Sequence, residues 1–515
     1  MVEAQILVVG VITASIVILS ILWFKSKKLD QPPLPPGPRG LPILGYLPFL
    51  SSNNLHHDFT KLATKFGPIY RLWLGSKLCV VISSPALAKE VVRDHDKVMA
   101  NRDVPIAVRV LYPGGLDIAW APYGSNWRTM RKVFVKDMLS NNNLEAAHVH
   151  LKNEVKKSIR FVYSKIGTPI NIGELAYTIG LNVIMTMVWG GTLDEELRGT
   201  AEEGFRNLSP QVMDLLGKPN ISDLFSLPDF LDLQGISKQM KNVGKQLHGL
   251  LDLVIDQRMK MMSNGRVEYK SKDDQNTKDF LQILLELKER NDGGAKINIS
   301  QIKAMIIDMF LGGIDTTATT LEWVMAEILA NPNVKERVTQ ELNDVIGMDT
   351  NVEDIHLNRL NYLEAVLKES SRMHPPLPVL VPRSPTQSCI VGGYTIPKDT
   401  RVLINVQSIH RDPQAWQNPS KFDPERFLDE NGKCDFDGAN FQYLPFGSGR
   451  RICAGLPLAK TTLMYVLPSL LQSFDWMIPN GEEVDLEDKF GIVVKKKVPL
   501  FACPSPRLHN SKLYE

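Results

Sequence analysis

The spacing of hydrophobic and polar positions changes several times along the chain. From about residue 84 to 367, apolar residues recur three or four positions apart, which is the pattern of amphipathic helices. Residues 68–82 and 390–406 are instead rich in β-branched residues and are interrupted by Gly or Pro, as strands and turns are. Ala4 to Phe24 carries no charged residue. The pattern predicts a mainly α protein with a minor β portion, preceded by an apolar segment.

Two local elements follow directly from this pattern. Residues 68–74 and 77–82 read as strands of a hairpin, with a Gly-Ser turn between them. Ser84 is then followed by Pro85, which is the arrangement of an N-cap and a first helical position. We therefore predict a helix that runs to about Asp94.

The uncharged segment Ala4 to Phe24 is long enough to cross a membrane. At about 1.5 Å per residue, a helix of this length spans about 30 Å, which is the thickness of a bilayer core. Lysines cluster at 25–28, whereas only Glu3 precedes the segment, and this asymmetry places the bulk of the chain in the cytosol. A cleaved signal peptide is the alternative. The apolar run is long for that, and no small-residue cleavage site follows it.

The residues that follow this apolar segment predict a boundary between an anchor and a globular domain. Residues 31–38, Gln-Pro-Pro-Leu-Pro-Pro-Gly-Pro, predict a stiff extended spacer. Beyond it we expect no second membrane span and no internal repeat, and the polar run 263–276 predicts an exposed loop. The expected organisation is a transmembrane anchor at 1–24, a basic and proline-rich linker at 25–45 and one catalytic domain at 46–515.

Composition narrows the class of protein. The 515 residues carry a formal net charge of +2, which gives no electrostatic case for nucleic-acid binding. The ten histidines show no HExxH pattern and no other close metal-ligand spacing. The five cysteines are odd in number and widely spaced, so they fit a reducing compartment better than a disulfide framework or a zinc site.

The most specific stretch is Pro-Phe-Gly-Ser-Gly-Arg-Arg-Ile-Cys-Ala-Gly at 445–455, which sets Cys453 on a glycine-rich turn ahead of an apolar helical pattern. Backbone N–H groups of a tight turn and the positive end of a following helix both compensate a thiolate charge. Glycines let the backbone approach a flat porphyrin. The stretch indicates a thiolate bound to haem iron, a ligand that favours O–O cleavage.

A second pattern interrupts the long apolar helix expected at 301–330. Gly-Gly-Ile-Asp-Thr-Thr at 312–317 contains two glycines, each of which costs about 1 kcal/mol relative to Ala in a helix interior. A packing kink is one explanation. The other is a groove over a cofactor, in which Asp315 and a threonine hydroxyl deliver protons to bound dioxygen. Beside Cys453, the groove is the better explanation.

Charged residues supply two further candidates. Glu369 and Arg372 lie one helical turn apart, as in many solvated surface pairs, but Arg426 in an irregular segment could join them in a buried network. Trp127 and Arg131 share one helical face, which fits either a basic surface helix or contacts to a haem propionate. Because a guanidinium matches a carboxylate and stays charged, two more propionate candidates are Arg383 and Arg451.

Taken together, the chain resembles the cytochrome P450 family of haem-thiolate monooxygenases. The signature Phe446-x-x-Gly449-x-Arg451-x-Cys453-x-Gly455 carries most of the resemblance. Gly-Gly-x-Asp-Thr-Thr at 312–317, Glu-x-x-Arg at 369–372 and Pro-Glu-Arg-Phe at 424–427 occur in family order with family-like spacing. The resemblance implies the cytochrome P450 fold, a triangular helical haem domain, here behind an N-terminal transmembrane helix.

The resemblance assigns a role to each matching position. Cys453 would be the axial iron ligand, and Thr316 with Asp315 would assist protonation of iron-bound dioxygen. The remaining residues that would contact haem are Phe446, Gly449, Gly455, Trp127, Arg131, Arg383 and Arg451. The structural triad would be Glu369, Arg372 and Arg426.

The family further implies haem b and electrons from NADPH through a separate reductase. The sequence agrees, since it shows neither a Walker-type P-loop nor a convincing strand–GxGxxG–helix fingerprint. The expected partner is the membrane-bound NADPH–cytochrome reductase, with a cytochrome b-type donor as a second candidate. The reductase would dock near Lys132 and Arg450, although basic residues of this kind are also common on any solvated protein surface. The implied location is the endoplasmic reticulum membrane, single-pass, with the catalytic domain facing the cytosol.

Within the family the chain looks like the plant microsomal biosynthetic branch, on stretches such as 35–42, 74–84 and 452–459. It is most similar to hydroxylases of sesquiterpene hydrocarbons of the cadinene or valencene type, whose relatives oxidise flavonoids. Positions that match family substrate-recognition regions are the loop 106–121 with Asp117, and Phe310, Leu311, Ile314, Val379, Leu380, Ile492 and Val493. Most of them are apolar, which favours a lipophilic substrate, although many would serve equally well as core.

Two rival functions stay open at this point. One is a haem isomerase or dehydratase that needs no external electrons. The Asp315–Thr316 pair argues against this function. The other is a membrane-tethered haem carrier or gas-binding protein. Such a binder has no need for a proton-delivery pair beside a strongly donating thiolate.

Overall fold

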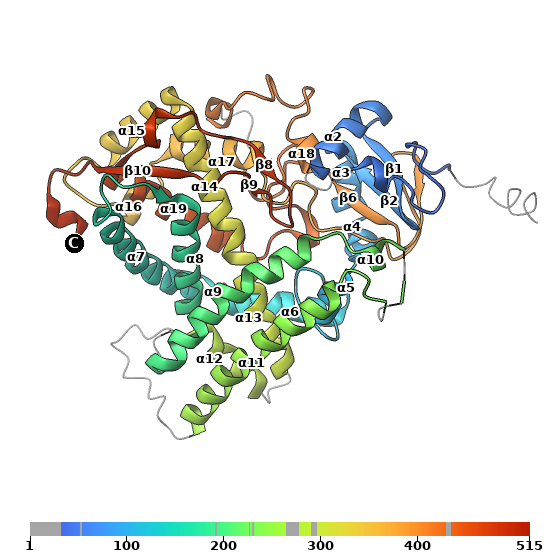
Figure 1. Ribbon diagram of the computed structural model, residues 1–515, viewed down its shortest axis with the longest axis horizontal. Coiled ribbons are helices and arrows are strands. Elements are labelled where there is room, and N and C mark those ends of the chain that lie inside the picture. The colour runs from blue at the N-terminus through green and yellow to red at the C-terminus, as the bar shows by residue number, and fades with distance from the viewer. Residues whose placement is uncertain are drawn as a thin grey trace, which may run out of the picture.

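The computed structural model describes residues 32–51, 54–190, 193–225, 227–228, 231–263, 278–289, 296–428 and 434–515. The expected anchor at 1–24, most of the polar run 263–276 and part of the linker lie outside these residues. In the described part, helices form one large body, and a small β-rich region with α2 and α3 lies at one end of it (Figure 1). This is the mainly α architecture with a minor β portion that the pattern predicts.

The helices have the following bounds: α2 Leu55–Phe66, α3 Pro85–Lys89, α4 Asp96–Met99, α5 Ile106–Leu111, α6 Ser125–Lys132, α7 Asn141–Tyr163, α8 Ile172–Trp189, α9 Glu195–Gly217, α10 Ile221–Phe225, α11 Ile236–Ser263, α12 Phe280–Glu289, α13 Ile299–Gly313, α14 Asp315–Ala330, α15 Pro332–Val345, α16 Asp354–Leu357, α17 Asn361–Met373, α18 Val406–Ile409 and α19 Leu456–Ser473. Strands are β1 Ile69–Leu74, β2 Lys77–Ile82, β3 Ile170–Asn171, β4 Cys389–Val391, β5 Tyr394–Ile396, β6 Arg401–Ile404, β7 Phe474–Met477, β8 Asp488–Lys489, β9 Lys495–Lys496 and β10 Phe501–Pro506.

The predicted hairpin and the helix behind it are both present. β1 and β2 pair antiparallel, and Gly75 turns the chain with a φ of 62°, which glycine adopts without strain. The Ser84 side chain accepts the Leu87 N–H, so it caps α3 as predicted, and the helical turn continues as a π-type segment over Glu90–Asp94. β6 then joins β2 in parallel register and completes a three-stranded sheet in the order β1-β2-β6.

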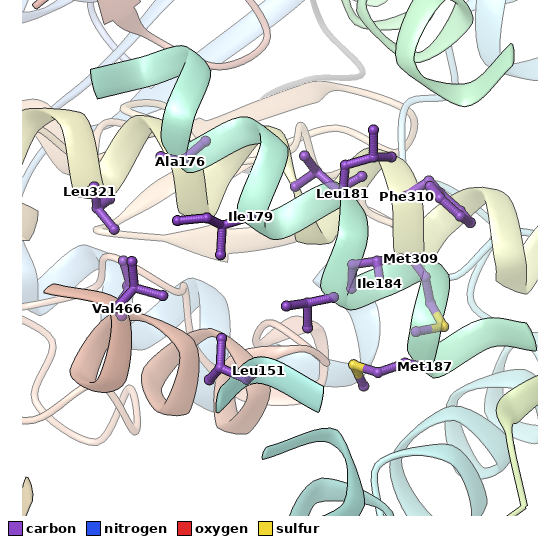
Figure 2. Packing of buried hydrophobic residues seen from close by; sticks show 14 of the residues in the cluster. Leu151, Ala176, Ile179, Leu181, Ile184, Met187, Met309, Phe310, Leu321 and Val466 are labelled. Atoms are coloured by element: carbon purple, nitrogen blue, oxygen red, sulfur yellow. The ribbon is translucent and has the colours of Figure 1, made fainter. Parts of the chain in front are cut away.

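The core of the helical body is built around α8, which packs on α7 and α14. Figure 2 shows Ile179 and Ile184 of α8 among Leu151 of α7, Leu321 of α14 and Val466 of α19. Each is at most 3% exposed, and burying such a side chain stabilises the fold by about 1.5–3 kcal/mol.

By length and composition alone, α8 could also cross a membrane, a candidate that we did not expect behind the linker. It is apolar on all sides because it is a central helix, and 67% of its residues are buried inside the protein.

Candidate haem site

The loop that carries Cys453 is held in a fixed shape. The Cys453 N–H donates to the carbonyl of Phe446 at 3.0 Å, and the loop then leads directly into α19. Gly449 has a φ of 69°, and a Cβ at this position would collide with the carbonyl oxygen of Val92. Glycine is therefore required here both by the backbone angle and by the close approach of the neighbouring segment.

The environment of the Cys453 sulfur suits a metal-bound thiolate. Burial raises the pKa of the thiol, while the backbone N–H groups of Gly455 and Leu456 and the charge of Arg131 oppose that increase. The first turn of α19 adds the positive end of its dipole. The surface of Cys453 nevertheless remains open, as a ligand's must. Such a thiol loses its proton readily once a metal ion coordinates it.

The long apolar helix breaks where the sequence predicts. α13 ends at Gly313 and α14 begins at Asp315, with Ile314 between them. The Thr316 hydroxyl donates to the carbonyl of Gly312 at 2.6 Å. A Cβ on Gly312 would meet nothing within 4 Å, although most of the surrounding helix is buried. The break thus opens a space beside Gly312 and Thr316.

Asp315 lies beside that space and is 7% exposed. One carboxylate oxygen accepts from the Lys495 ammonium of β9 at 2.5 Å. The other oxygen is buried without a hydrogen-bond partner in the part of the chain that the structure describes. Because the Lys495 side chain is 48% exposed, it connects a buried carboxylate to the surface.

An arginine of the Cys453 loop, Arg451, lies close to two arginines from other segments, Arg102 and Arg383. Arg451 donates to the carbonyls of Ala100, Ile118 and Ala121. Arg383 donates to Met99 and Ser448, and Arg102 to Ala119 and Val381, again only to carbonyl oxygens. Arg102 was missed in the sequence, where it is one unremarkable arginine in Asn-Arg-Asp; only its position in the fold identifies it.

This arginine cluster, Arg102, Arg383 and Arg451, contains three cations whose charge the nearby carboxylates Asp117 and Asp96 offset only in part. Burial lowers the pKa of each guanidinium, to about 10 for Arg383 and about 9 for Arg451, and the neighbouring arginines lower those of Arg102 and Arg451 further. Among the described residues these side chains form no ion pair within 4 Å. Buried guanidiniums without an ion-pair partner favour a ligand that carries carboxylates, and the porphyrin of haem carries two propionate carboxylates.

Trp127 and Arg131 differ in their contacts. The Trp127 indole N–H donates to the Ile118 carbonyl at 2.9 Å, and its ring lies 4.2 Å from the Arg451 guanidinium. Arg131 forms no hydrogen bond with any residue of the described ranges and influences the Cys453 sulfur by its charge. Arg131 thus has its donors available for a propionate, whereas Trp127 already uses its one donor.

The structure brings the three residues of the expected triad together. Arg372 donates twice to Glu369, at 2.7 and 2.8 Å, and both side chains are 0% exposed. Arg426 donates to the same carboxylate at 3.1 Å. Arg372 also donates to the carbonyls of His410 and Pro419, so the network fixes an irregular segment to α17. The surface-pair alternative for Glu369 and Arg372 is therefore wrong.

His410 extends this network toward the cysteine loop and was not recognised in the sequence. Its Nδ1 lies 3.1 Å from the Arg372 carbonyl, and its Nε2 accepts the Leu444 N–H at 2.8 Å. These partners fix a neutral ring that carries its proton on Nδ1. Burial, followed by the charges of Arg372 and Arg411, lowers the pKa of His410 to about 3. Since Leu444 shortly precedes the signature loop, the ring connects the triad to that loop.

The expected substrate contacts divide into two groups. Val379, Leu380 and Ile492 are partly exposed, and Leu380 lies against Gly447 of the cysteine loop. Phe310, Leu311, Ile314 and Val493 are at most 8% exposed. Phe310 in particular stacks on Phe205 at 3.8 Å between ring centroids and on Trp189 at 5.4 Å, so its ring belongs to the core, contrary to our expectation.

The segment at 112–121 is fastened to α13 by a carboxylate that sequence inspection did not single out. Asp308 accepts the Tyr112 hydroxyl at 2.9 Å and the Ile118 N–H at 2.6 Å. Asp117 lies near it, 1% exposed, and burial together with Asp117 raises the pKa of Asp308 well above its usual range. Asp117 itself accepts the Trp120 N–H, so its first role is to shape this loop.

A mainly helical protein with an open cysteine in a glycine loop and a buried cationic cluster is suited to hold haem through a thiolate. A family model described as Cytochrome P450 matches residues 35–503. A geraniol 8-hydroxylase of Swertia mussotii is 38% identical over 96% of this chain and 97% of its own, and a flavonoid 3'-monooxygenase of Crocosmia x crocosmiiflora is 34% identical over 95% and 96%. The chain belongs to the cytochrome P450 family.

A solved structure agrees with this assignment. A zebra fish cytochrome P450 determined with progesterone superposes with a TM-score of 0.73 at 27% identity, covering 88% of this chain and 99% of its own. The protein is accordingly a cytochrome P450 monooxygenase that uses haem b and takes its electrons from NADPH through a reductase. This assignment replaces the two rival functions, the electron-independent isomerase and the haem carrier.

Proposed function

We propose that this enzyme hydroxylates a lipophilic plant metabolite, with a sesquiterpene as the substrate class. The observation that carries the proposal is the apolar character of the partly exposed positions Val379, Leu380 and Ile492, of which Leu380 lies against Gly447 of the cysteine loop. An apolar lining with few polar groups suits a hydrocarbon better than a polyphenol. The geraniol 8-hydroxylase among its relatives acts on a terpenoid, and the flavonoid 3'-monooxygenase makes a flavonoid the second candidate.

In the proposed mechanism, bound haem supplies the chemistry that activates dioxygen. The chain positions the substrate, shields the site from water and supplies protons. Cys453 would hold the iron from the glycine loop, while Arg131, Arg383 and Arg451 would hold the propionates, with Arg102 beside them. Thr316 and Asp315 would deliver protons at the helix break. The Thr316 hydroxyl is pre-oriented by its bond to the Gly312 carbonyl, and Lys495 links Asp315 to the surface.

The substrate class is tested by co-expressing the full chain with a plant reductase and supplying sesquiterpenes and flavonoids in separate reactions. We expect NADPH-dependent hydroxylation of a sesquiterpene, identified by mass spectrometry. Turnover of flavonoids with none of the sesquiterpenes converted would overturn the proposal and favour the second candidate.

The proton-delivery role is tested with two variants at one position. Thr316→Ala removes the hydroxyl, so we expect the product formed per NADPH to fall by about tenfold or more, with peroxide replacing product. Thr316→Ser keeps the hydroxyl and is expected to retain most of the coupling. Equal coupling in both variants would show that the hydroxyl delivers no proton.

We further propose that residues 4–24 anchor the enzyme in the endoplasmic reticulum, with the catalytic domain in the cytosol and the reductase docking near Lys132. Lys132 is exposed, whereas Arg450 already pairs with Asp96 at 2.9 Å and offers less free charge. Deletion of residues 1–24 is expected to release much of the protein from microsomes under carbonate extraction. Complete retention would contradict the anchor.

A further inference from the structure

Two adjacent histidines near the start of α2 face one carboxylate from the far end of the chain. Nε2 of His56 lies 3.0 Å from Oδ2 of Asp488, and Nε2 of His57 lies 3.1 Å from the same oxygen. The ligand atoms of the three residues all lie within 4.8 Å of one another. The histidine spacing alone did not suggest a metal site, because the third residue is 432 positions away from His56.

We propose that His56, His57 and Asp488 bind a zinc ion. Two imidazole nitrogens and one carboxylate oxygen are ligands that Zn²⁺ accepts, and catalytic zinc sites commonly use three protein ligands with a solvent molecule in the fourth position. This site is separate from the haem loop and from every residue to which a role in oxygen chemistry is given above.

The separations of the ligand atoms suit this ion. Zinc bonds of about 2.0–2.2 Å in a tetrahedron place neighbouring ligand atoms about 3.4 Å apart. Here the nitrogen–oxygen separations are 3.0 Å for His56 and 3.1–3.3 Å for His57. The nitrogen–oxygen separations thus differ from the tetrahedral value by a few tenths of an ångström, and all ligand atoms lie within 4.8 Å of one another. An ion would replace the protons that the two rings now share with the carboxylate.

The cluster is fixed on one side and open on the other. His56 is 1% exposed, and its ring stacks on Phe490, with 5.5 Å between centroids and 18° between planes. His57 is 42% exposed and Asp488 17%, so solvent reaches the cluster and can complete the coordination. An ion thus has an entry path to three ligands, one of which, His56, is already held in place.

The surroundings of the second ring nitrogen of His56 determine the affinity that we expect for zinc. Nδ1 of His56 is buried without a hydrogen-bond partner in the ranges that the structure describes. A zinc-bound imidazole usually donates its other N–H to a partner, and loss of such a partner weakens binding by about 10- to 100-fold. We therefore expect a dissociation constant of about 1–10 µM rather than the far tighter binding of structural zinc sites.

An ion at this position would join distant parts of the chain. Asp488 belongs to β8, which pairs with β9, and both strands run between the helical body and the end that carries α2 (Figure 1). The turn between the strands includes Ile492, and β9 carries Lys495, the partner of Asp315. Zinc would therefore fasten this ribbon to α2 and restrict its movement. The effect on stability is independent of the proposed substrate and of the proton pathway.

The test is isothermal titration calorimetry, in which zinc chloride is added to the full-length, haem-loaded protein after a chelator has removed metal ions other than haem iron. We expect one ion per chain at about 1–10 µM and a zinc-dependent rise in melting temperature. His57→Ala and Asp488→Asn should each weaken binding by at least about tenfold. His509→Ala is the matched control, because His509 also pairs with an aspartate, Asp349, but at the surface and without a third ligand.

X-ray absorption at the zinc edge gives a readout that needs no variant and that haem iron does not disturb. It should show about two imidazole nitrogens at about 2.0 Å together with oxygen ligands. Absence of a one-to-one binding event below about 100 µM, affinity unchanged in both site variants, or a spectrum without imidazole would each overturn the proposal.

Discussion

The buried triad of Glu369, Arg372 and Arg426 and the arginine cluster beside the cysteine loop both place guanidinium groups inside the protein, and they balance this charge differently. In the triad, one carboxylate accepts hydrogen bonds from both arginines, and backbone carbonyls and the Met373 sulfur accept from the remaining donors. In the arginine cluster, all three guanidiniums donate only to carbonyls.

The difference separates a structural element from a binding site. The triad is complete with the protein's own groups, so its expected role is to hold the irregular segment and the loop behind it. The arginine cluster remains short of negative charge, and neighbouring arginines lower the pKa of Arg102 and of Arg451. It is suited to a ligand that brings carboxylates. The following experiments test this distinction, from the largest expected effect to the smallest.

Cys453→Ala should have the largest effect, because we propose that this residue ligates the haem that both regions would support. We expect complete loss of the reduced-CO spectrum that is typical of a thiolate ligand. Cys434→Ser, at a partly buried cysteine of another loop, is the control and should keep the spectrum. A thiolate-type spectrum in Cys453→Ala would refute the ligand assignment.

Glu369→Gln should destabilise the protein strongly, because it leaves the buried Arg372 and the partly buried Arg426 without their counter-ion. Removing one partner of a buried ion pair typically costs about 3–5 kcal/mol. We expect a large fall in folded, haem-containing protein, measured as the ratio of haem to total polypeptide and by urea unfolding. Glu425→Gln disrupts an exposed pair with Arg337 and should cost less than about 1 kcal/mol.

Arg383→Met distinguishes the two regions most directly, because its effect should depend on the ligand. In haem-free protein the variant removes one buried charge that forms no ion pair among the described residues, so we expect little loss of stability or a gain. In haem-loaded protein it would also remove the proposed propionate contact, so haem should dissociate several-fold faster, as followed by transfer to apomyoglobin. Equal destabilisation of both forms would mean that Arg383 is structural, like Arg372.

His410 should give the smallest effect at neutral pH, because its contribution appears only as a dependence of stability on acidification. Its pKa is about 3 in the fold and has a reference value of 6.5, so the unfolded chain binds a proton below about pH 6.5 while the folded chain does not. Stability therefore falls as the pH decreases from 6.5 toward 3, by up to about 1.4 kcal/mol per pH unit from this group. His410→Gln should reduce that slope in urea titrations between pH 5 and 7, whereas His509→Gln, at an exposed histidine, should not.

The sequence predicted the features whose interacting residues lie close together along the chain, and it missed those whose partners lie far apart. The β1–β2 hairpin, the break at Ile314 and the Glu369–Arg372 pair are local patterns, and each appears at the predicted position. Arg102, His410 and Asp308 were not recognised, since their partners lie far away in sequence. The Ile118 peptide shows why: it is bound by Asp308 on one side and by Trp127 and Arg451 on the other, and no local spacing encodes that convergence.

Phe310 illustrates the opposite error. Its position on the long helix suggested a substrate contact, yet the ring turns toward Phe205 and Trp189. Periodicity identifies which residues are apolar, but a helix in the middle of a protein has apolar surroundings on several sides. Only the packing decides whether such a side chain faces a cavity or another helix.

The parallel pairing of β2 with β6 has a consequence for synthesis of the protein. Its partner residues, such as Cys79 and Arg401, are separated by roughly 320 residues of chain. At about 5–20 residues per second, a ribosome needs between about 16 and 64 s to make that interval. Throughout this time the β1–β2 hairpin presents an open edge, a known template for aggregation. Yield in a foreign host should therefore depend on chaperones that protect the early hairpin until the late strand emerges.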